Sequence, residues 1–197
     1  MCSSDLVSRG RGPRVIAGEF GGLGLSVPRG SRTRPTSDRV KESVFAALGD
    51  RVVDAVVLDL YAGSGALAIE ALSRGATRAV AVDQDAGALT AIRTNRDRIR
   101  LGDRLAVRGR AVAAYLPGAA ADGPFDLVFA DPPYDTADSV VAAHLEALAA
   151  PGLLAPGAAV VLERPGGREP QLADGWCAAW VRTYGDTLVV LCEPDGD

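Results

Sequence analysis

The sequence is poor in the residues that build metal centres, disulfide frameworks and membrane spans. Its 197 residues include one histidine, His144, and three cysteines, Cys2, Cys177 and Cys192, too few and too scattered for a zinc site or a disulfide framework. No uninterrupted apolar run approaches the roughly 18–20 residues that cross a bilayer. The N-terminus lacks the basic-then-apolar order of a secretory signal. We therefore expect a cytoplasmic protein that holds no metal and has no membrane partner.

Lysine is also scarce, and the basic residues are unevenly distributed. The formal net charge of −4 argues weakly against a nucleic-acid partner. Residues 1–41, however, carry eight Lys and Arg against three Asp and Glu, whereas the remainder carries 13 against 22. A basic arm on an acidic body is typical of an extension that binds a polyanion. A second basic stretch is explained equally well by a solvated helix face or by phosphate contact, and it comprises Arg93, Arg96, Arg98, Arg100, Arg104, Arg108 and Arg110.

From residue 52 onward, apolar runs typical of strands alternate with patterns typical of helices. This alternation predicts an α/β fold, with a doubly wound, mostly parallel sheet covered by helices on both faces. The expected strands cover residues 56–60, 79–82, 105–108, 125–130 and 158–163, and the expected helices cover 66–73, 86–101 and 139–149. Two final runs, 176–184 and 187–192, predict an antiparallel hairpin at one edge of the sheet.

The N-terminal part predicts a small extension before this sheet. Residues 14–17 and 25–27 flank a glycine-rich turn and predict a β-hairpin. A basic loop follows, and a helix is expected to begin near residues 36–37, where a hydroxyl side chain can cap it, and to end at Gly49. The organisation that we expect is a flexible leader over residues 1–13, the hairpin and helix extension over 14–50, and the main α/β domain over 51–197.

A glycine-rich loop, Asp59-Leu60-Tyr61-Ala62-Gly63-Ser64-Gly65, connects the first strand of the main domain directly to a helix. Glycines let the backbone approach a ligand closely, and a helix N-terminus favours anionic or polar groups. Asp83 ends the next strand, where its carboxylate can bind ribose hydroxyls. The pattern alone is ambiguous, because Gly63, Gly65 and Ala68 also satisfy the dinucleotide fingerprint of NAD-binding enzymes.

Asp59 favours S-adenosylmethionine over NAD. It stands four residues before Gly63, where a carboxylate can receive the ammonium group of methionine. The pyrophosphate of NAD is negative, so an NAD-binding enzyme has no obvious need for a carboxylate at this position. Ligands of open α/β sheets bind beyond the carboxyl ends of the strands, so Asp59, Gly63, Asp83 and Asp131 should converge there. The alternatives are a cap or turn residue for Asp59 and a helix N-cap for Asp83.

The tetrapeptide Asp131-Pro132-Pro133-Tyr134 follows a predicted buried strand and is the most informative motif of the chain. Asp131 can accept a hydrogen bond from an exocyclic amino group. The prolines have no N–H and fix φ, which holds the Pro132 carbonyl ready to accept a second bond. Tyr134 can stack on the base. The motif therefore indicates a site for a planar base with an amino group, the alternative being an ordinary turn.

Four motifs, residues 34–45, 59–65, 131–134 and 184–187, together resemble a known family. Over roughly residues 14–193 the chain resembles the bacterial 16S ribosomal RNA guanine-N2 methyltransferases of the RsmD type. The resemblance implies a class I methyltransferase fold, S-adenosylmethionine as cofactor and a guanine of small-subunit rRNA as target. The chain departs from the family just after the third strand, where relatives often carry an Asp or Asn that helps to hold adenine and this sequence has Arg110 before Ala111. The Ala111 backbone N–H could still serve.

The resemblance and the motifs together assign roles to individual residues. The cofactor site would comprise Asp59, Ala62, Gly63, Gly65, Asp83 and Ala111, and the catalytic site Asp131, Pro132, Pro133 and Tyr134. The RNA contacts would be Arg14, Arg29, Arg32, Arg34, Arg39 and Lys41. We expect catalysis mainly by positioning and electrostatics, because His144 is interpreted as a surface or helix-packing residue and no other usual general base is apparent. Asp131 could take up the proton that the amine loses.

The expected partner is 16S rRNA, within an assembled or assembling small ribosomal subunit, and we expect a monomeric enzyme. Three alternatives remain open. An adenine-N6 methyltransferase of DNA or RNA uses similar chemistry, although 197 residues leave no room for a sizeable DNA target-recognition domain. An NAD-binding oxidoreductase would leave the Asp131–Tyr134 motif without a role. A non-catalytic RNA-binding assembly factor could keep the fold, but the intact Asp59 and Asp131 argue against it.

Overall fold

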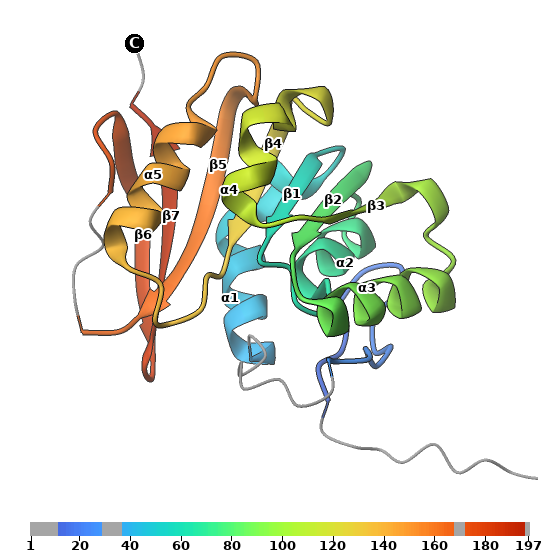
Figure 1. Cartoon of the computed structure of the whole chain (residues 1–197). Helices are drawn as coiled ribbons and strands as arrows, with labels where there is room; N and C mark the ends of the chain where they lie inside the picture. Colours follow the sequence, from blue (N-terminus) through green and yellow to red (C-terminus); the bar gives the residue numbers. More distant parts are fainter. Residues whose placement is uncertain (1–11, 29–36, 168–171, 196–197) are drawn as a thin grey trace, which may run out of the picture.

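The computed structural model describes residues 12–28, 37–167 and 172–195 of the chain. Within these ranges it forms one seven-stranded sheet with helices on both faces (Figure 1). The strands are β1 Val56–Leu60, β2 Arg78–Asp83, β3 Leu105–Gly109, β4 Phe125–Ala130, β5 Leu154–Pro165, β6 Trp176–Tyr184 and β7 Thr187–Pro194. The α-helices are α1 Asp38–Leu48, α2 Ala66–Ser73, α3 Ala86–Ile99, α4 Val112–Tyr115 and α5 Asp138–Leu148. None of the helices in the described ranges is long and apolar enough to cross a bilayer.

The strand order β3-β2-β1-β4-β5-β7-β6 confirms the predicted doubly wound sheet. Strands β1 to β5 run parallel to one another, whereas β7 pairs antiparallel with both β5 and β6. The predicted C-terminal hairpin therefore does form one edge of the sheet. The strand order changes direction between β1 and β4, and ligands of open α/β sheets bind at such a switch point, outside the carboxyl ends of the strands.

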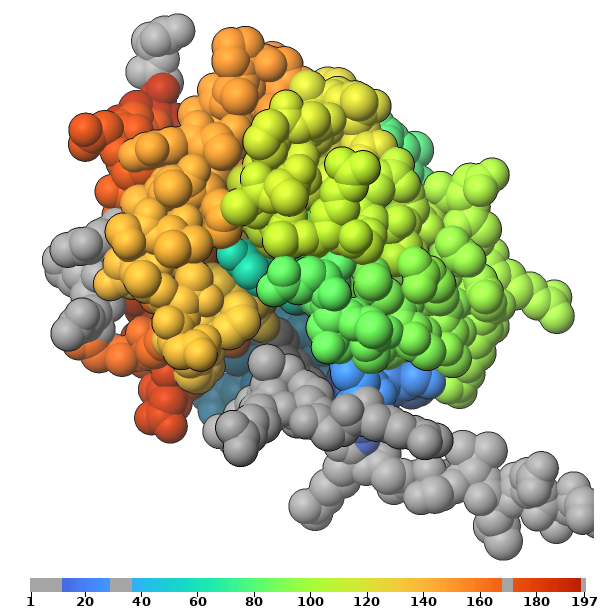
Figure 2. Space-filling view, viewed as in Figure 1, coloured from blue at the N-terminus to red at the C-terminus, as the bar shows by residue number. Residues whose placement is uncertain are grey.

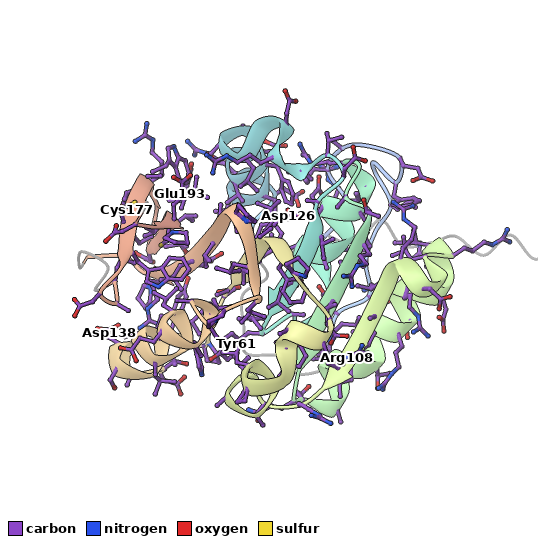
Figure 3. The ribbon with its side chains drawn as sticks, turned by 90° about the horizontal axis from the view of Figure 1, so that it is seen from above. Tyr61, Arg108, Asp126, Asp138, Cys177 and Glu193 are labelled. Atoms are coloured by element: carbon purple, nitrogen blue, oxygen red, sulfur yellow. The ribbon has the colours of Figure 1, made fainter. Side chains whose placement is uncertain are left out.

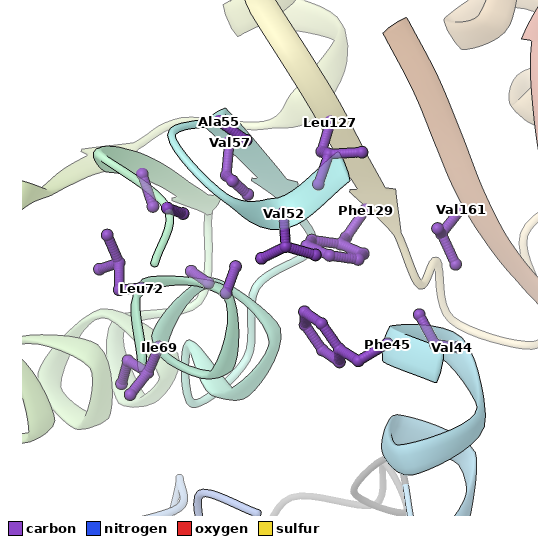
Figure 4. Close-up of a cluster of buried hydrophobic side chains, with 14 of the residues drawn as sticks. Val44, Phe45, Val52, Ala55, Val57, Ile69, Leu72, Leu127, Phe129 and Val161 are labelled. Carbon is purple, nitrogen blue, oxygen red and sulfur yellow. The ribbon is translucent and has the colours of Figure 1, made fainter. Parts of the chain in front are cut away.

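Two hydrophobic clusters, one on each face of the sheet, hold the helices in place. Neighbouring residues of a strand point to opposite faces, so Val57 belongs to one cluster and Leu58 to the other. Helices α1, α2 and α3 pack on the first face, and α4 and α5 on the second. On the first face the rings of Phe45 in α1 and Phe129 in β4 lie 5.6 Å apart between centroids (Figure 4). This contact fixes α1 directly over the sheet.

Helix α1 begins and ends as the sequence predicted. The Ser37 hydroxyl accepts a hydrogen bond from the Val40 N–H at 3.3 Å, which satisfies one of the unpaired donors of the first turn. Gly49 caps the helix with φ +53°, a conformation that residues with a side chain rarely adopt. Its buried face consists of Val40, Lys41, Val44, Phe45 and Leu48.

The predicted N-terminal hairpin is present only as a short antiparallel pairing, with one bridge, Arg14 to Gly24, in place of two full strands. Across the loop the Val15 N–H donates to the Leu23 carbonyl at 2.9 Å, and the Leu25 N–H to the Pro13 carbonyl at 2.8 Å. Between these arms, side chains of α2 satisfy other backbone groups of the loop. The buried Glu70 accepts the N–H groups of Ile16 at 2.7 Å and Ala17 at 3.1 Å. Backbone groups satisfied by side chains do not need a partner strand.

The loop also lies very close to α2, and Gly18 makes this approach possible. Its φ is +83°, and a Cβ atom at this position would lie 1.8 Å from the Ser73 carbonyl oxygen. The hydroxyl of Ser73 accepts the N–H of Phe20 at 2.9 Å and donates to the carbonyl of Ala17 at 2.5 Å. Val15 and Leu25 belong to the first-face cluster, so the described part of the extension shares a core with the main sheet.

An alanine-rich stretch forms two short helices that the sequence analysis did not predict. Residues 112–115 are α4, and a 3-10 helix continues over Leu116–Ala121. Tyr115 and Leu116 are buried in the second-face cluster. Too few large apolar side chains mark a helical period here, so the stretch is helical mainly because it packs against the sheet.

Candidate active site

The predicted cofactor residues gather at the carboxyl end of β1, between β2 and β4. Asp59 pairs with Ala81 of β2 on one side and with Phe129 of β4 on the other. Asp83 ends β2, and Asp131 follows directly after β4. Figure 2 shows the chain near residue 60, in teal, recessed between the amber segment that contains α5 and the green segment of α3. The predicted convergence of these residues therefore agrees with their places in the sheet.

The loop between β1 and α2 has an unusual backbone. Three of its residues have positive φ, namely Tyr61 at +59°, Gly63 at +56° and Gly65 at +75°. Glycine adopts such angles without steric cost, which explains the two glycines, whereas Tyr61 is held there against its preference. The N–H of Ala62 donates to the Val82 carbonyl at 3.1 Å and ties the loop to β2. The backbone is thereby fixed in a shape that lets a ligand approach it closely.

Asp83 fixes the same loop from β2. Its Oδ2 accepts the Gly63 N–H at 2.8 Å, and its Oδ1 accepts the Asp85 N–H at 2.9 Å. The N-cap of α3 is Asp85, which accepts the Ala88 N–H at 2.8 Å. Asp83 is thus not the N-cap that one alternative suggested. Its carboxylate stands at the edge of the site, in agreement with the proposed contact to ribose hydroxyls.

Asp59 is a carboxylate buried inside the sheet, with only 2% of its surface exposed. Its Oδ2 accepts the Ala68 N–H of α2 at 3.0 Å. Burial, opposed by the Ala68 hydrogen bond and assisted by the negative charges of Asp131 and Asp83, raises the pKa of Asp59 to about 7. A positive group beside these carboxylates would be stabilised, since opposite charges favour the ionised forms. The site thus fits the ammonium of methionine and disfavours a pyrophosphate.

The Asp131–Tyr134 motif forms the loop that leaves β4 at this edge. Pro132 is buried and Pro133 exposed, and the Thr136 N–H closes a turn by donating to the Pro133 carbonyl at 2.9 Å. Tyr134 is 51% exposed, so its ring presents an open face. Its hydroxyl lies 2.7 Å from the Thr187 hydroxyl at the start of β7. The ring is therefore tethered by its tip while its face is open for stacking.

The sequence analysis missed two contacts that support this site. His144 was interpreted as a surface or helix-packing residue, but its Nδ1 lies 3.0 Å from the hydroxyl of Tyr61 in the cofactor loop. Burial lowers the pKa of His144, which keeps the imidazole neutral near pH 7. Figure 3 shows Tyr61 beside α5, the helix that carries His144. Arg164 of β5 donates to the Thr136 carbonyl at 2.9 Å and to Asp138 at 2.7 Å, which fixes the chain after Tyr134.

Ala111 is the N-cap of α4, two residues after the end of β3. Its backbone is therefore at the same carboxyl edge of the sheet as Asp83, whose neighbour in β3 is Gly109. This position agrees with the expectation that an Ala111 N–H rather than a side chain would hold the adenine. Arg110 beside it is exposed.

The predicted RNA contacts differ in their exposure to solvent. Arg39 is exposed on α1, and Arg14, 58% exposed, forms an ion pair with Asp38 at 3.0 Å. Lys41 is completely buried, and its Nζ donates to the Arg14 carbonyl and lies 3.6 Å from Asp38. This burial argues against the prediction that Lys41 contacts RNA, and assigns it to docking the extension on α1. Three further predicted contacts, Arg29, Arg32 and Arg34, lie outside the described residues.

Much of the second basic stretch serves the fold. Arg108 forms a two-pronged ion pair with Asp122, at 2.9 and 2.6 Å. Arg98 donates to the Gly24 carbonyl, and Arg104 to the carbonyls of Leu72 and Ala76. Arg93, Arg100 and Arg110 are exposed. A structural role therefore suffices to explain Arg98, Arg104 and Arg108.

Comparison with known proteins shows a matching family and several similar proteins. The family described as "Conserved hypothetical protein 95" matches residues 13–193. The "Putative rRNA methyltransferase YlbH" of Bacillus subtilis is 41% identical over 122 residues, which cover 61% of this chain and 66% of that protein. The "Ribosomal RNA small subunit methyltransferase D" of Escherichia coli is 38% identical over 121 residues, or 61% of this chain and 60% of that protein. The matches thus span less than two thirds of either relative.

A solved structure extends the similarity over nearly the whole chain. The structure described as "Putative methyltransferase yhhF from Escherichia coli" superposes with a TM-score of 0.81 at 31% identity. The alignment covers 94% of this chain and 99% of that one. The similarity therefore includes the extension as well as the sheet.

Proposed function

The chain belongs to the Conserved hypothetical protein 95 family, and we propose that it is an S-adenosylmethionine-dependent methyltransferase of rRNA. Its target would be the exocyclic 2-amino group of a guanine in 16S rRNA of the small ribosomal subunit. One observation carries the proposal. The buried carboxylate of Asp59 and the Asp131–Tyr134 loop lie at adjacent strand ends, close enough for the charge of Asp131 to raise the pKa of Asp59.

The residues that hold the cofactor would be those of the loop after β1 and the ends of β2 and β3. Asp59 receives the ammonium group, Asp83 the ribose hydroxyls, and the Ala111 N–H the adenine. The bound cofactor supplies an electrophilic methyl group on a sulfonium. Gly63 and Gly65, with their positive φ, leave room for the ligand beside the backbone. Binding of NAD at this site is disfavoured, because the carboxylate of the buried Asp59 would repel the negative pyrophosphate.

The Asp131–Tyr134 loop would hold the target base. The guanine amine is a poor nucleophile because its lone pair is delocalised into the ring. Asp131 and the Pro132 carbonyl would accept hydrogen bonds from its two N–H groups, which would turn the nitrogen lone pair toward the methyl group supplied by the bound cofactor. Asp131 would take up the proton that the amine loses on receiving this methyl group. Tyr134 stacks on the base, which must leave its own stack to reach the site.

The basic residues of the extension would hold the RNA backbone near the site. Arg14 and Arg39 are on the described surface, and Arg29, Arg32 and Arg34 belong to the segment between them. Phosphate contacts of this kind position the RNA and carry no sequence information. The substrate would be rRNA within an assembled or assembling subunit, and the enzyme would act as a cytoplasmic monomer.

Replacement of Asp131 tests the proposal. Asp131→Ala should abolish methyl transfer and leave cofactor affinity within a few-fold, because the carboxylate faces the base rather than the cofactor. Asp131→Asn keeps one acceptor oxygen but loses the charge that stabilises a developing ammonium, so it should lose about a hundred- to a thousand-fold in rate. Single-turnover methylation of subunits that lack the modification measures both. A near-normal rate for Asp131→Ala would reduce the motif to an ordinary turn.

A further inference from the structure

Asn95 in α3 is a buried amide that connects two separate parts of the chain. Its side chain has no exposed surface. The Oδ1 accepts the N–H of Ser26 at 2.8 Å, and the Nδ2 donates to the carbonyls of Ser26 and Ser64, each at 2.9 Å. The carboxamide thus uses its oxygen and both hydrogens in these bonds. Buried amides with this degree of satisfaction have one fixed orientation.

One of these partners belongs to the cofactor loop. Ser64 lies between Gly63 and Gly65, whose positive φ values define the shape of the loop. Ile92, one turn before Asn95, supports the same loop, since a Cβ atom at Gly65 would lie 3.5 Å from its side chain. The loop therefore rests on α3 through one apolar and one polar side chain. Asn95 also hydrogen-bonds to the extension, at Ser26.

The other partner, Ser26, lies just before the basic segment, by which we mean residues 29–34 with Arg29, Arg32 and Arg34. Ser26 is held by Asn95 at both its N–H and its carbonyl, as a neighbouring strand would hold it. Two residues later, Pro28 lies against the start of α3, with its Cβ 3.5 Å from the Cβ position of Gly87. Arg29, Arg32 and Arg34, three of the proposed RNA contacts, follow directly in the sequence. The same helix therefore anchors the cofactor loop and the chain that leads into the basic segment.

We propose that Asn95 is a positioning residue that links the cofactor loop to the RNA-binding segment. The inference rests on the proposed cofactor and RNA sites. When a bound cofactor restrains the loop at Ser64 more tightly, the shared carboxamide also restrains Ser26 at the start of the chain that leads into the basic segment. Loss of the carboxamide removes the support of both, since three backbone groups then lose their buried partner.

The first test needs no substitution. Hydrogen exchange of the full-length protein is measured with and without S-adenosylhomocysteine, and two amides of the same extension are compared. The Ser26 N–H donates to Asn95, whereas the Glu19 N–H donates to the Ser73 carbonyl at 2.8 Å. We expect the ligand to slow exchange at Ser26 at least fivefold and to leave Glu19 within twofold. Equal protection of both amides, or of neither, overturns the inference.

The second test uses variants and calorimetry with S-adenosylhomocysteine. Asn95→Leu preserves the approximate volume and removes all three hydrogen bonds, and Asn95→Asp keeps only an acceptor for the Ser26 N–H. Both should bind the ligand about tenfold more weakly and lose the selective protection of Ser26. The matched control is Leu148→Ala in α5, a buried position on the opposite face of the sheet, which should lower stability without changing affinity.

These outcomes separate the inference from the proposed function. If the wild-type protein does not bind S-adenosylhomocysteine, the cofactor assignment fails. If it binds, but the Asn95 variants bind equally well or weaken only as much as Leu148→Ala, then Asn95 has no positioning role. Neither readout depends on which base is methylated.

Discussion

Replacing Asp59 by asparagine should make the cofactor-free protein more stable above neutral pH. Burial and the charges of Asp131 and Asp83 raise the pKa of Asp59 from 3.8 to about 7 in the folded chain. Between about pH 4 and pH 7 the folded protein keeps a proton that the unfolded chain has released, so the free energy of unfolding falls as the pH rises. At about 1.36 kcal/mol per pKa unit, this destabilisation reaches at most about 4 kcal/mol above pH 7.

Asp59→Asn removes the charge and keeps an oxygen that can accept the Ala68 N–H. The assay is urea unfolding of the cofactor-free protein at several values of pH between 4 and 8. Wild type and Asp59→Asn should have similar free energies of unfolding near pH 4, and the variant should be more stable at pH 8. Asp103→Asn, at an exposed carboxylate, should follow the wild-type curve. Identical pH profiles for Asp59→Asn and wild type would refute the reasoning.

Asp59→Asn, which should stabilise the cofactor-free protein, should weaken the binding of the cofactor. The ionised Asp59 is the proposed partner of the methionine ammonium, so Asp59→Asn should bind S-adenosylmethionine more weakly. Wild-type affinity should rise as the pH increases through about 7 and Asp59 ionises, whereas the variant should lose this rise. A ligand stabilises the form that binds it, so cofactor should raise the stability of wild type more than that of the variant. Calorimetry across pH 6 to 8 measures this difference.

Three further predictions concern the other residues of the site. Asp83→Ala should weaken cofactor binding by about 1–3 kcal/mol, because the Gly63 N–H and the ribose hydroxyls lose the carboxylate that pairs with them; unchanged calorimetric affinity would exclude Asp83 from the site. Arg34→Ala with Arg39→Ala should weaken RNA binding and flatten its salt dependence, since fewer counterions are released. Lys41→Met, its buried control, should lower stability and leave the salt slope unchanged. Tyr134→Phe should reduce single-turnover methylation only mildly and Tyr134→Ala severely; equal losses would mean that the hydroxyl, rather than stacking, matters.

Most strands and helices of the sheet could be predicted because their sequences are strongly patterned. β4 is a run of apolar residues buried on both faces, and α2 begins after a glycine and ends before one, so residues alone mark their limits. The ends of β1, β2 and β4 carry the aspartates of the site. Once the alternation of strands and helices indicates a parallel sheet, these ends must meet at one edge.

The N-terminal loop shows where sequence patterns stop being informative. Its alternation suggests two strands, but the two arms pair over only a short stretch, and Glu70 and Ser73 of α2 accept the N–H groups of Ile16, Ala17 and Phe20. Nothing in residues 14–27 indicates this, because both side chains are more than 40 positions away in the sequence. The burial of Lys41 was also missed, because a lysine on an amphipathic helix is normally exposed. Its partner, the Arg14 carbonyl, lies in the extension and not on the helix.

The supporting contacts of the site were also outside the reach of the sequence. His144 and Asn95 each lie in a helix whose pattern gives no reason to single them out. Their roles depend on what the opposite surface presents, namely the Tyr61 hydroxyl and the Ser64 carbonyl. Such contacts follow from the packing of helices on the sheet, which short-range patterns do not encode.

Identification of the methylated nucleoside tests the central claim most directly. Small ribosomal subunits that lack the modification are incubated with the protein and methyl-labelled S-adenosylmethionine, and the rRNA is digested to nucleosides. We predict that the label appears in N2-methylguanosine from 16S rRNA, and that it disappears with Asp131→Ala. Label in N6-methyladenosine, or no transfer by a protein that binds the cofactor, would contradict the proposed function.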